Sequence, residues 1–383
     1  LKMTTTINNE HKKLNVPNST DKGNVIRNVP HLRFPEFEGE WEKCKFKDVC
    51  NISTGNKNTQ DKADDGIYPF YVRSQTVERI NSWTFDGEAI LTAGDGVGVG
   101  KVFHHSYGKI GVHQRVYILS DFKCDANYLF HFFSSKFYNR VKRMSAKNSV
   151  DSVRKEMITD MPLSLPCHKE QVQIGHMLSL LDERIATQSK IIEDLKKLKS
   201  AISKKLLCND KWTTCIIQDI AEIGRGRVIS SVEIDRQKNP LYPVYSSQTS
   251  NNGIMGYLDN YMFDGEYITW TTDGANAGTV FYRKGKFNCT NVCGTLKIQS
   301  KFDCYFVSLV LQQATQKYVS SNLANPKLMN NTMASIKIRM PNIETQKQLS
   351  KVFQTLDSCL LVHQRTCKMY QSEKQYLLRQ MLI

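Results

Sequence analysis

The sequence predicts a mixed α/β protein of the α+β class, built from two tandem copies of one unit. Two observations predict this fold: a motif that recurs 178 residues further along the chain, and a long heptad segment that closes each copy. The stretch WTFDGEAILTAGDGVGVGKVF (Trp83–Phe103) matches YMFDGEYITWTTDGANAGTVF (Tyr261–Phe281) at 10 of 21 positions. Further matching stretches begin at Trp41 and Trp212, so the internal repeat covers most of the sequence.

The first part of each unit consists of short aromatic and β-branched runs broken by Gly, Asn and Asp. This pattern is typical of strands and turns, interrupted by a few helices such as the one expected over 127–141. We expect the polar N-terminal arm to be mobile as far as about Pro35. The predicted parts are the arm over 1–39, a first globular domain over 40–167, a first long helix over 168–208, a second globular domain over 209–342 and a second long helix over 343–383.

Each predicted long helix follows a proline and carries apolar residues at alternating intervals of four and three, which is a heptad pattern. The predicted seam of the first helix is Ile174, Leu178, Leu181, Ile185, Gln188, Ile192, Leu195, Lys199, Ile202 and Leu206. The predicted seam of the second helix is Leu349, Phe353, Leu356, Leu360, His363, Cys367, Tyr370, Lys374, Leu377 and Met381.

Both seams become polar at the same two positions, Gln188 with His363 and Lys199 with Lys374. Polar residues at such positions cost stability and can fix register and partner, so we expect the two helices to pack against each other. The alternative is that each helix packs separately on its own globular domain. The spacing fits parallel and antiparallel pairs alike, and the tandem connection favours an antiparallel pair.

The charge of the chain favours a polyanionic partner. Lys and Arg number 52 against 37 Asp and Glu, a net charge of +15, which makes nucleic acid the first candidate. The alternative is a basic protein that its charge keeps soluble. The 11 cysteines follow neither a disulfide framework nor zinc spacing, so we expect reduced packing residues in a cytoplasmic protein. The sequence shows neither a membrane-length apolar run nor the apolar segment of a signal peptide.

The glycine-rich stretch does not fit a nucleotide site. A P-loop needs Gly-x4-Gly-Lys-Ser/Thr, but here Asp95 stands at the first glycine and Val102 at the hydroxyl position, and Thr279 replaces the lysine in the second copy. The stretch NPLY (Asn239–Tyr242) lacks the second proline of the adenine methyltransferase motif Asn-Pro-Pro-Tyr. The sequence offers no convincing carboxylate cluster for a nuclease. We therefore predict no catalytic residue, no metal site and no cofactor in this chain.

The remaining candidates are long basic or amide side chains in loops flanked by Gly and Ser. Arg and Lys can bind the guanine edge, Asn and Gln the adenine edge, and cations also bind phosphates. For any single residue the alternative is ordinary surface polarity. In the first unit the candidates are Lys57, Arg73, Ser74, Gln75, Lys101, His104, His105, Gln114, Arg115, Lys147, Asn148 and Arg154. In the second unit they are Arg225, Arg227, Ser247, Gln248, Asp273, Arg283, Lys284, Asn322, Asn325 and Lys327.

The two copies keep Phe-Asp-Gly-Glu, Asp-Gly and Val-Phe and vary the residues between them. A duplicated catalytic site should keep its chemical groups in at least one copy. Two domains that recognise different ligand sequences should instead keep the scaffold and vary the residues that contact the ligand. The pattern of the repeat therefore favours recognition over catalysis.

With these features the chain resembles the specificity subunit of type I restriction–modification enzymes. The resemblance rests on HLRFPEFEGEW (His31–Trp41), on LPCHKEQVQI (Leu165–Ile174), on the weaker echo MPNIETQKQL (Met340–Leu349) and on the order domain, helix, domain, helix. The echo places its glutamate at Glu344 rather than at position 345. The resemblance implies that each globular unit is a target recognition domain that reads one half of a split, asymmetric DNA site. It also implies that the helices form an antiparallel coiled coil that sets the distance between the halves.

The resemblance further implies partners in addition to double-stranded DNA. Two modification subunits would methylate adenine with S-adenosylmethionine, and two restriction subunits would add translocation and cleavage driven by ATP and Mg. These cofactors would belong to the partners, and the chain itself would be non-catalytic. Two alternatives stay open: a basic scaffold protein that binds DNA without sequence preference, and a self-contained DNA methyltransferase or nuclease.

Overall fold

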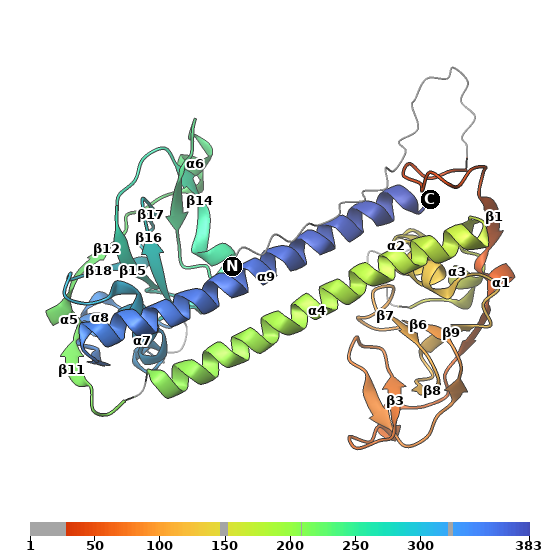
Figure 1. Cartoon of the computed structure of the whole chain (residues 1–383), viewed down its shortest axis with the longest axis horizontal. Helices are drawn as coiled ribbons and strands as arrows, with labels where there is room; N and C mark the ends of the chain where they lie inside the picture. The colour runs from red at the N-terminus through yellow and green to blue at the C-terminus, as the bar shows by residue number, and fades with distance from the viewer. Residues whose placement is uncertain (1–27, 146–151, 208, 321–324) are drawn as a thin grey trace, which may run out of the picture. The chain divides into compact units, whose positions relative to one another are not determined.

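The computed structural model describes residues 28–145, 152–207, 209–320 and 325–383. The chain divides into two units. Unit 1 contains the described residues up to Ser189 together with Arg365–Ile383, and unit 2 contains Lys190–Gln364. The long helices are α4 (His168–Leu206) and α9 (Ile343–Met381), green-yellow and blue in Figure 1. Each long helix therefore contributes one part to each unit.

Unit 1 builds its globular part from two sheets of four strands each, ordered β2-β9-β6-β7 and β4-β3-β8-β5. Neighbouring strands are antiparallel except β3 and β8, which are parallel. The strands are β1 (Glu42–Lys45), β2 (Asn51–Thr54), β3 (Tyr68–Tyr71), β4 (Glu78–Ile80), β5 (Phe85–Asp86), β6 (Ala89–Ala93), β7 (Phe103–Ser106), β8 (Lys109–Val112), β9 (Val116–Ser120) and β10 (Pro162–Leu165). The helices are α1 (Phe46–Val49), η1 (Thr59–Asp61), α2 (Ala126–Met144) and α3 (Lys155–Thr159).

Helix α2 supplies the centre of the unit 1 core. Asp125 caps its first turn by accepting a hydrogen bond from the Tyr128 amide at 2.8 Å. Phe132 and Phe133 lie on one face of the helix, are almost fully buried and contact the ring of Phe46. The predicted helix over 127–141 lies inside α2. Because burial of each aromatic side chain contributes about 1.5–3 kcal/mol, this face anchors α2 in the domain.

Unit 2 repeats the plan with sheets ordered β12-β18-β15-β16 and β14-β13-β17. Trp270 and Phe306 are fully buried in its core, together with Phe353 from α9. Its strands are β11 (Thr213–Ile216), β12 (Ala221–Arg225), β13 (Tyr242–Tyr245), β14 (Ile254–Leu258), β15 (Glu266–Thr271), β16 (Val280–Lys284), β17 (Asn288–Cys289), β18 (Cys293–Ile298) and β19 (Lys337–Met340). Its helices are α5 (Ile217–Ile220), α6 (Ser231–Asp235), η2 (Ser250–Gly253), α7 (Cys304–Ala314), η3 (Thr315–Tyr318) and α8 (Asn330–Ser335).

The first and last strands of each globular domain pair with each other. In unit 1 β1 pairs antiparallel with β10, where Glu42 faces Leu165. In unit 2 β11 pairs antiparallel with β19, where Thr213 faces Met340. The chain therefore enters and leaves each domain at one place, next to the start of a long helix.

One glutamine joins the long helix to the globular domain in each copy. The Gln171 side chain accepts a hydrogen bond from the Asp125 amide at 2.9 Å and donates to the carbonyl of Pro166 at 2.7 Å. The Gln346 side chain accepts from the Asp303 amide, also at 2.9 Å. Both glutamines belong to the motifs that follow a proline, LPCHKEQVQI and MPNIETQKQL. The motif thus positions the long helix on the domain that precedes it.

The long helices run antiparallel, and the contacts inside unit 1 show this directly. Lys374 of α9 pairs with Asp182 of α4, with Nζ 2.6 Å from Oδ2. Seven residues further along α4, Ser189 lies 3.8 Å from the sulfur of Cys367, which stands earlier in α9. Since position rises along one helix while it falls along the other, the pair is antiparallel, as the tandem connection favours.

Each seam lysine pairs with an aspartate of the other helix, which the sequence analysis missed. Lys199 of α4 pairs with Asp357 of α9 inside unit 2, and this mirrors the pair between Lys374 and Asp182 in unit 1. The repeat offset of 175 residues relates the two lysines and also the two aspartates. That shared offset was the signal available in the sequence. Such pairs contribute little to stability at partly exposed positions, but they disfavour registers that leave the lysine unpaired.

The other seam positions are buried or half-buried, with one exception. Leu206 is 36% exposed, whereas Leu207 is 5% exposed and belongs to the unit 2 core. The difference arises because α4 ends at Leu206, so the heptad spacing no longer sets the direction of the next side chains. At this end of the seam the structure places Leu207, rather than Leu206, in the core.

The N-terminal arm is ordered earlier than we expected. Leu32 is buried in the unit 1 core, and its amide donates to the carbonyl of Gln380 at 3.0 Å. The Arg33 guanidinium makes two hydrogen bonds of 2.8 Å to the buried carboxylate of Glu170. The expectation of a mobile arm as far as Pro35 is therefore wrong for residues 28–35. A buried carboxylate needs such a partner, and the second copy carries Thr345 at the position equivalent to Glu170.

We expect unit 1 to lose stability in mild acid because of His131. Burial, with a smaller contribution from Lys374, lowers the pKa of His131 from 6.5 to about 3. Below about pH 6.5 this histidine is protonated in the unfolded chain but stays neutral in the folded chain. The free energy of unfolding therefore falls as the pH falls. The expected loss from this group between pH 7 and pH 5 is about 2 kcal/mol.

Urea unfolding of the wild type and of His131→Asn at pH 7 and pH 5 measures this contribution. The variant should lose less stability than the wild type over the same interval. Equal losses in the two proteins would show that His131 does not carry the effect.

Candidate nucleic-acid interface

One glycine in each domain allows two backbone segments to cross at close distance. A β-carbon on Gly55 would lie 2.1 Å from the carbonyl oxygen of Val112, and one on Gly226 would lie 2.1 Å from that of Cys289. Directly after each crossing, Lys57 and Arg227 form isolated parallel bridges with the facing loop. The frame of the repeat therefore places a cation at the same point of both domains.

In unit 1 three candidate loops meet at Asp95. This residue stands in the glycine-rich turn after β6 and accepts a hydrogen bond from Arg73, which follows β3, at 2.9 Å. Arg115, between β8 and β9, brings its Nε to 3.7 Å from the same carboxylate. Asp95 thus holds two long guanidinium side chains at one edge of the domain, where each keeps other donors available.

Around this cluster the surface forms an open recess of about 480 Å³. The Gln114 amide donates to the side chain of Asn58 at 2.6 Å across it. His113 lies beneath, and burial followed by the charge of Arg73 lowers its pKa. The recess is lined by Asn58, Thr59, Gln60, Arg73, Asp95, His113, Gln114 and Arg115. This arrangement offers guanidinium and amide groups together, which suits base edges and phosphates.

Asp273 plays the part of Asp95 in unit 2, with different cations. It lies 3.5 Å from Nη2 of Arg225 and 3.7 Å from Nζ of Lys327. The hydroxyl of Thr272 also donates to it at 2.6 Å. The carboxylate therefore recurs in both copies, while its cationic partners come from non-equivalent positions of the sequence.

Two candidates are packing residues. Arg283 is 3% exposed and lies between the rings of Tyr245 and Phe281, 3.6 and 4.4 Å from their centroids. Burial lowers the pKa of Arg283 to about 10. His105 bonds Glu88 at 2.9 Å and stacks on the ring of Phe130. These contacts place both side chains inside their domains rather than at a free edge.

The remaining unit 1 candidates make local contacts or are exposed. Lys101 lies over the ring of Tyr138 at 5.1 Å. A ring nitrogen of His104 lies 3.1 Å from the carbonyl of Ser74, and burial lowers the pKa of this histidine. Gln75 and Arg154 are exposed.

In unit 2 most other candidates already have protein partners. Arg227 pairs with Glu233, and Lys284 lies 3.1 Å from Glu266. The Gln248 side chain donates to the carbonyl of Ile254. The backbone carbonyl of Ser247 accepts a hydrogen bond from the Asn276 side chain, and Asn325 is exposed beside the Asp273 turn. The candidates Lys147, Asn148 and Asn322 lie outside the described residues.

Sequence reasoning also missed several amide side chains. Asn58 and Gln60 line the unit 1 recess. Asn251 and Asn252 are exposed in unit 2 and adopt left-handed φ values of 47° and 54°, which asparagine tolerates better than most residues. The dipeptide Asn-Gly at 252–253 was a turn signal that could have directed attention to this loop.

The described residues offer little for other chemistry. Within the described ranges, no group of His, Cys, Asp and Glu could hold a metal ion. The cysteines of this part of the chain are free thiols. Among the described helices, none combines the length and apolar character that crossing a membrane requires.

Comparison with known proteins identifies a family. The type I restriction modification DNA specificity domain matches residues 38–197 and again 209–368. A Mycoplasma pneumoniae chain assigned as a type I specificity subunit is 37% identical over 199 residues, which cover 51% of this chain and 82% of that one. The specificity subunit of the type I restriction enzyme MpnII, from the same species, is 42% identical over 146 residues, 38% of this chain and 43% of that one.

A crystal structure of the S subunit of a type I restriction–modification system from M. genitalium has the same fold. It matches with a TM-score of 0.75 at 16% identity, over 93% of this chain and 99% of that one. The mixed α/β fold with two tandem specificity domains is thereby confirmed. The chain belongs to the specificity subunits of type I restriction–modification systems, the non-catalytic subunits that recognise DNA.

Proposed function

We propose that the two globular domains read two different halves of one asymmetric DNA site. The observation that carries this proposal is the pair of equivalent aspartates with non-equivalent cations. Asp95 holds Arg73 and Arg115, whereas Asp273 lies beside Arg225 and Lys327. The same scaffold therefore presents different donors in the two domains, as two readers of different sequences require.

The antiparallel helices are proposed to form one coiled coil that sets the spacer between the half-sites. Each helix has 39 residues, and at about 1.5 Å per residue this is a length of about 58 Å. One turn of DNA is about 34–36 Å, so such a rod could hold two readers over successive groove faces. The two lysine–aspartate pairs support one fixed register of the helices. A coiled coil that sets the spacer length needs such a fixed register.

The family and the two-fold repeat support a proposal for the partners. We assign two modification subunits, which methylate adenine with S-adenosylmethionine, and two restriction subunits, which use ATP and Mg, to one chain in the cytoplasm. The cofactors are held by these partners in the proposal. Each half of the repeat supplies one equivalent place for one copy of a partner.

Methylation mapping tests the proposed function. The chain is co-expressed with its modification partner in a host without other adenine methylation, and modified adenines are located by sequencing. We expect one split, non-palindromic motif with a spacer of constant length. A palindromic or contiguous motif would contradict two unequal readers, and turnover by the purified chain alone would contradict the non-catalytic assignment.

Neutralising Asp95 should weaken sequence discrimination while it raises affinity for arbitrary DNA. Asp95→Asn removes a negative charge that repels phosphates, and it also frees Arg73 and Arg115 from their orientation. A bidentate contact contributes about 1–3 kcal/mol of discrimination, so we expect a loss of about tenfold or more at positions in one half-site. Competition binding at fixed salt, with duplexes altered in each half, measures both effects.

Two variants serve as controls for this prediction. Asp273→Asn should relax the other half-site only, because it acts on the cations of unit 2. Asp64→Asn removes the same charge from a carboxylate that is 93% exposed and does not line the recess, and it should leave discrimination unchanged. Unaltered discrimination in Asp95→Asn would show that Asp95 does not position the readers.

A further inference from the structure

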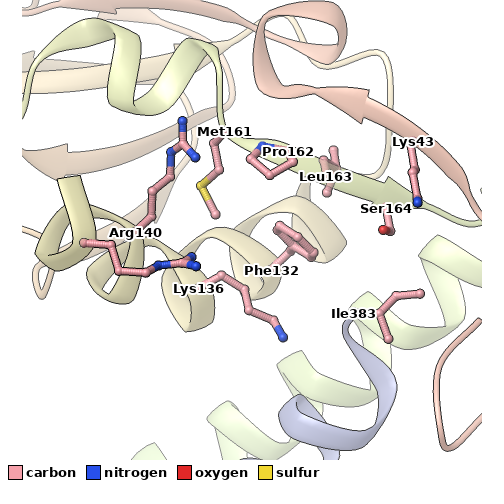
Figure 2. Close-up of a pocket in the computed structure, with 10 residues that line it drawn as sticks. Lys43, Phe132, Lys136, Arg140, Met161, Pro162, Leu163, Ser164 and Ile383 are labelled. Carbon is pink, nitrogen blue, oxygen red and sulfur yellow. The ribbon is translucent and has the colours of Figure 1, made fainter. Parts of the chain in front are cut away.

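Unit 1 contains a second recess, of about 410 Å³, which is separate from the recess around Asp95, Arg73 and Arg115. Figure 2 shows Phe132 and Lys136 of α2, Lys43 of β1 and Ile383 after α9 around one space. Its floor is apolar and includes Phe132, Met161, Leu163 and Ile383, and its cations are Lys43, Lys136, Arg140 and Arg143. We call this recess 1. No Asp or Glu side chain is among the described residues that line it.

Backbone carbonyls hold two of these cations without neutralising them. Lys136 Nζ donates to the carbonyl of Leu382 at 2.8 Å. Arg140 donates to the carbonyls of Met157 and Asp160 at 2.8 and 3.0 Å. These hydrogen bonds fix the two positive charges in place, where an anionic group that enters the recess would meet them. Asp160, which pairs with Lys45 and Lys47, also acts on Arg140 from outside the lining.

Unit 2 has a recess at the equivalent place, of about 540 Å³, which we call recess 2. Its apolar residues Val310 and Ile338 are the repeat equivalents of Phe132 and Leu163, at offsets of 178 and 175. Leu207 stands here as the equivalent of Leu382, at the end of the other long helix. The same elements of the repeat therefore build both recesses.

The cations of recess 2 come from other positions of the repeat. They are Lys317, Lys337 and Arg339, and Arg339 pairs with Asp210 outside the lining. At the offsets above, Lys337 and Arg339 replace Pro162 and Ser164. Both recesses therefore combine positive charge with apolar residues, although the individual cations stand at different positions of the repeat. This recurrence indicates that both recesses bind the same kind of ligand.

We propose that each recess receives an acidic segment of one modification subunit, anchored by a bulky apolar side chain. The proposal rests on the proposed function, in which such subunits assemble with this chain. An apolar floor within a charged rim is the arrangement in which a buried anchor supplies affinity and the surrounding charges supply orientation. DNA presents phosphates and base edges but no projecting apolar side chain to fill the floor.

The elements involved leave the DNA-reading cluster free. The Asp95 cluster lies after β3 and β6 and between β8 and β9, whereas recess 1 is built by α2, β1, β10 and the end of α9. DNA and a modification subunit could therefore occupy one domain together. Two recesses related by the repeat would bind two copies of the same partner.

Charge reversals in the full chain test this proposal. The first variant is Lys43→Glu with Arg143→Glu in recess 1, and the second is Lys317→Glu with Lys337→Glu in recess 2; all four residues are exposed. The control is Lys123→Glu with Lys301→Glu, which makes the same number of reversals at repeat-equivalent positions outside both recesses. Circular dichroism verifies folding of every variant.

Two readouts are measured: the stoichiometry with purified modification subunit, by light scattering, and the DNA affinity of the chain alone. We expect two bound subunits for the wild type and the control, one for each recess variant and none for the combined variant. The DNA affinity of each recess variant should match that of the control, which carries the same number of reversals. Two subunits on the combined variant would overturn the proposal, and so would a loss of DNA affinity with assembly intact, which would assign the recesses to nucleic acid. A wild-type chain that binds no modification subunit would instead contradict the proposed function, and the inference with it.

Discussion

Exchanging residues 212–340 for the corresponding segment of a relative is expected to replace one half of the methylated motif and leave the other half unchanged. The exchange is clean because β11 and β19 pair with each other, so the segment enters and leaves the domain at one place. The Asp95 cluster belongs wholly to unit 1 and keeps its geometry. Sequencing of methylated adenines after co-expression with the modification partner measures the result.

The donor segment must accept the recipient's helix. Phe353 of α9 is fully buried in the unit 2 core and stays in place, so the donor should carry a large apolar residue at the equivalent position of its own helix. The reciprocal exchange of residues 41–165, bounded by the pair β1–β10, should replace the other half of the motif. A change in both halves after a single exchange would contradict independent reading by the two domains.

Lengthening both long helices by one heptad is expected to lengthen the spacer by about three base pairs. The insertions are placed between Ser189 and Lys190 and between Gln364 and Arg365, where the chain passes from one unit to the other. Contacts within each unit stay intact, including both lysine–aspartate pairs. Seven residues add about 10.5 Å at about 1.5 Å each, and one base pair spans about 3.4 Å.

Affinity should fall even when the spacer adjusts. Three base pairs also rotate the groove by about 100°, since DNA turns once in about 10.5 base pairs, whereas a heptad returns the helix seam to nearly the same face. Binding-site selection from a randomised duplex pool measures spacer and affinity together. An insertion in α4 alone is the control, because one of the two lysine–aspartate pairs then loses its register and the chain should bind DNA more weakly without a defined new spacer. An unchanged spacer in the doubly lengthened chain would contradict the proposal that the coiled coil sets the spacer length.

The repeat and its helices could be predicted because both appear as patterns in the sequence, the repeat as matching stretches and the helices as heptad spacing. The proline before each segment and the heptad spacing after it led us to expect helices that begin at 168 and 343, and α4 and α9 begin at these residues. The glycine crossings at Gly55 and Gly226 lie inside the matched stretches that revealed the repeat. The candidate loops were also visible, as Gly- and Ser-flanked segments with basic side chains. Their membership in one cluster was not, since the chain separates Arg73, Asp95 and Arg115.

By itself, the sequence determined that this protein is a two-fold repeat of domain and helix, basic in charge, with a seam on each helix. These properties depend on composition, on spacing and on likeness between two stretches of one chain. Only the tertiary structure decided which side chains face each other: Asp182 for Lys374, Glu170 for Arg33, and two aromatic rings for Arg283. The partners of the first two pairs lie 192 and 137 residues apart, and no local periodicity specifies a contact made by packing of distant elements.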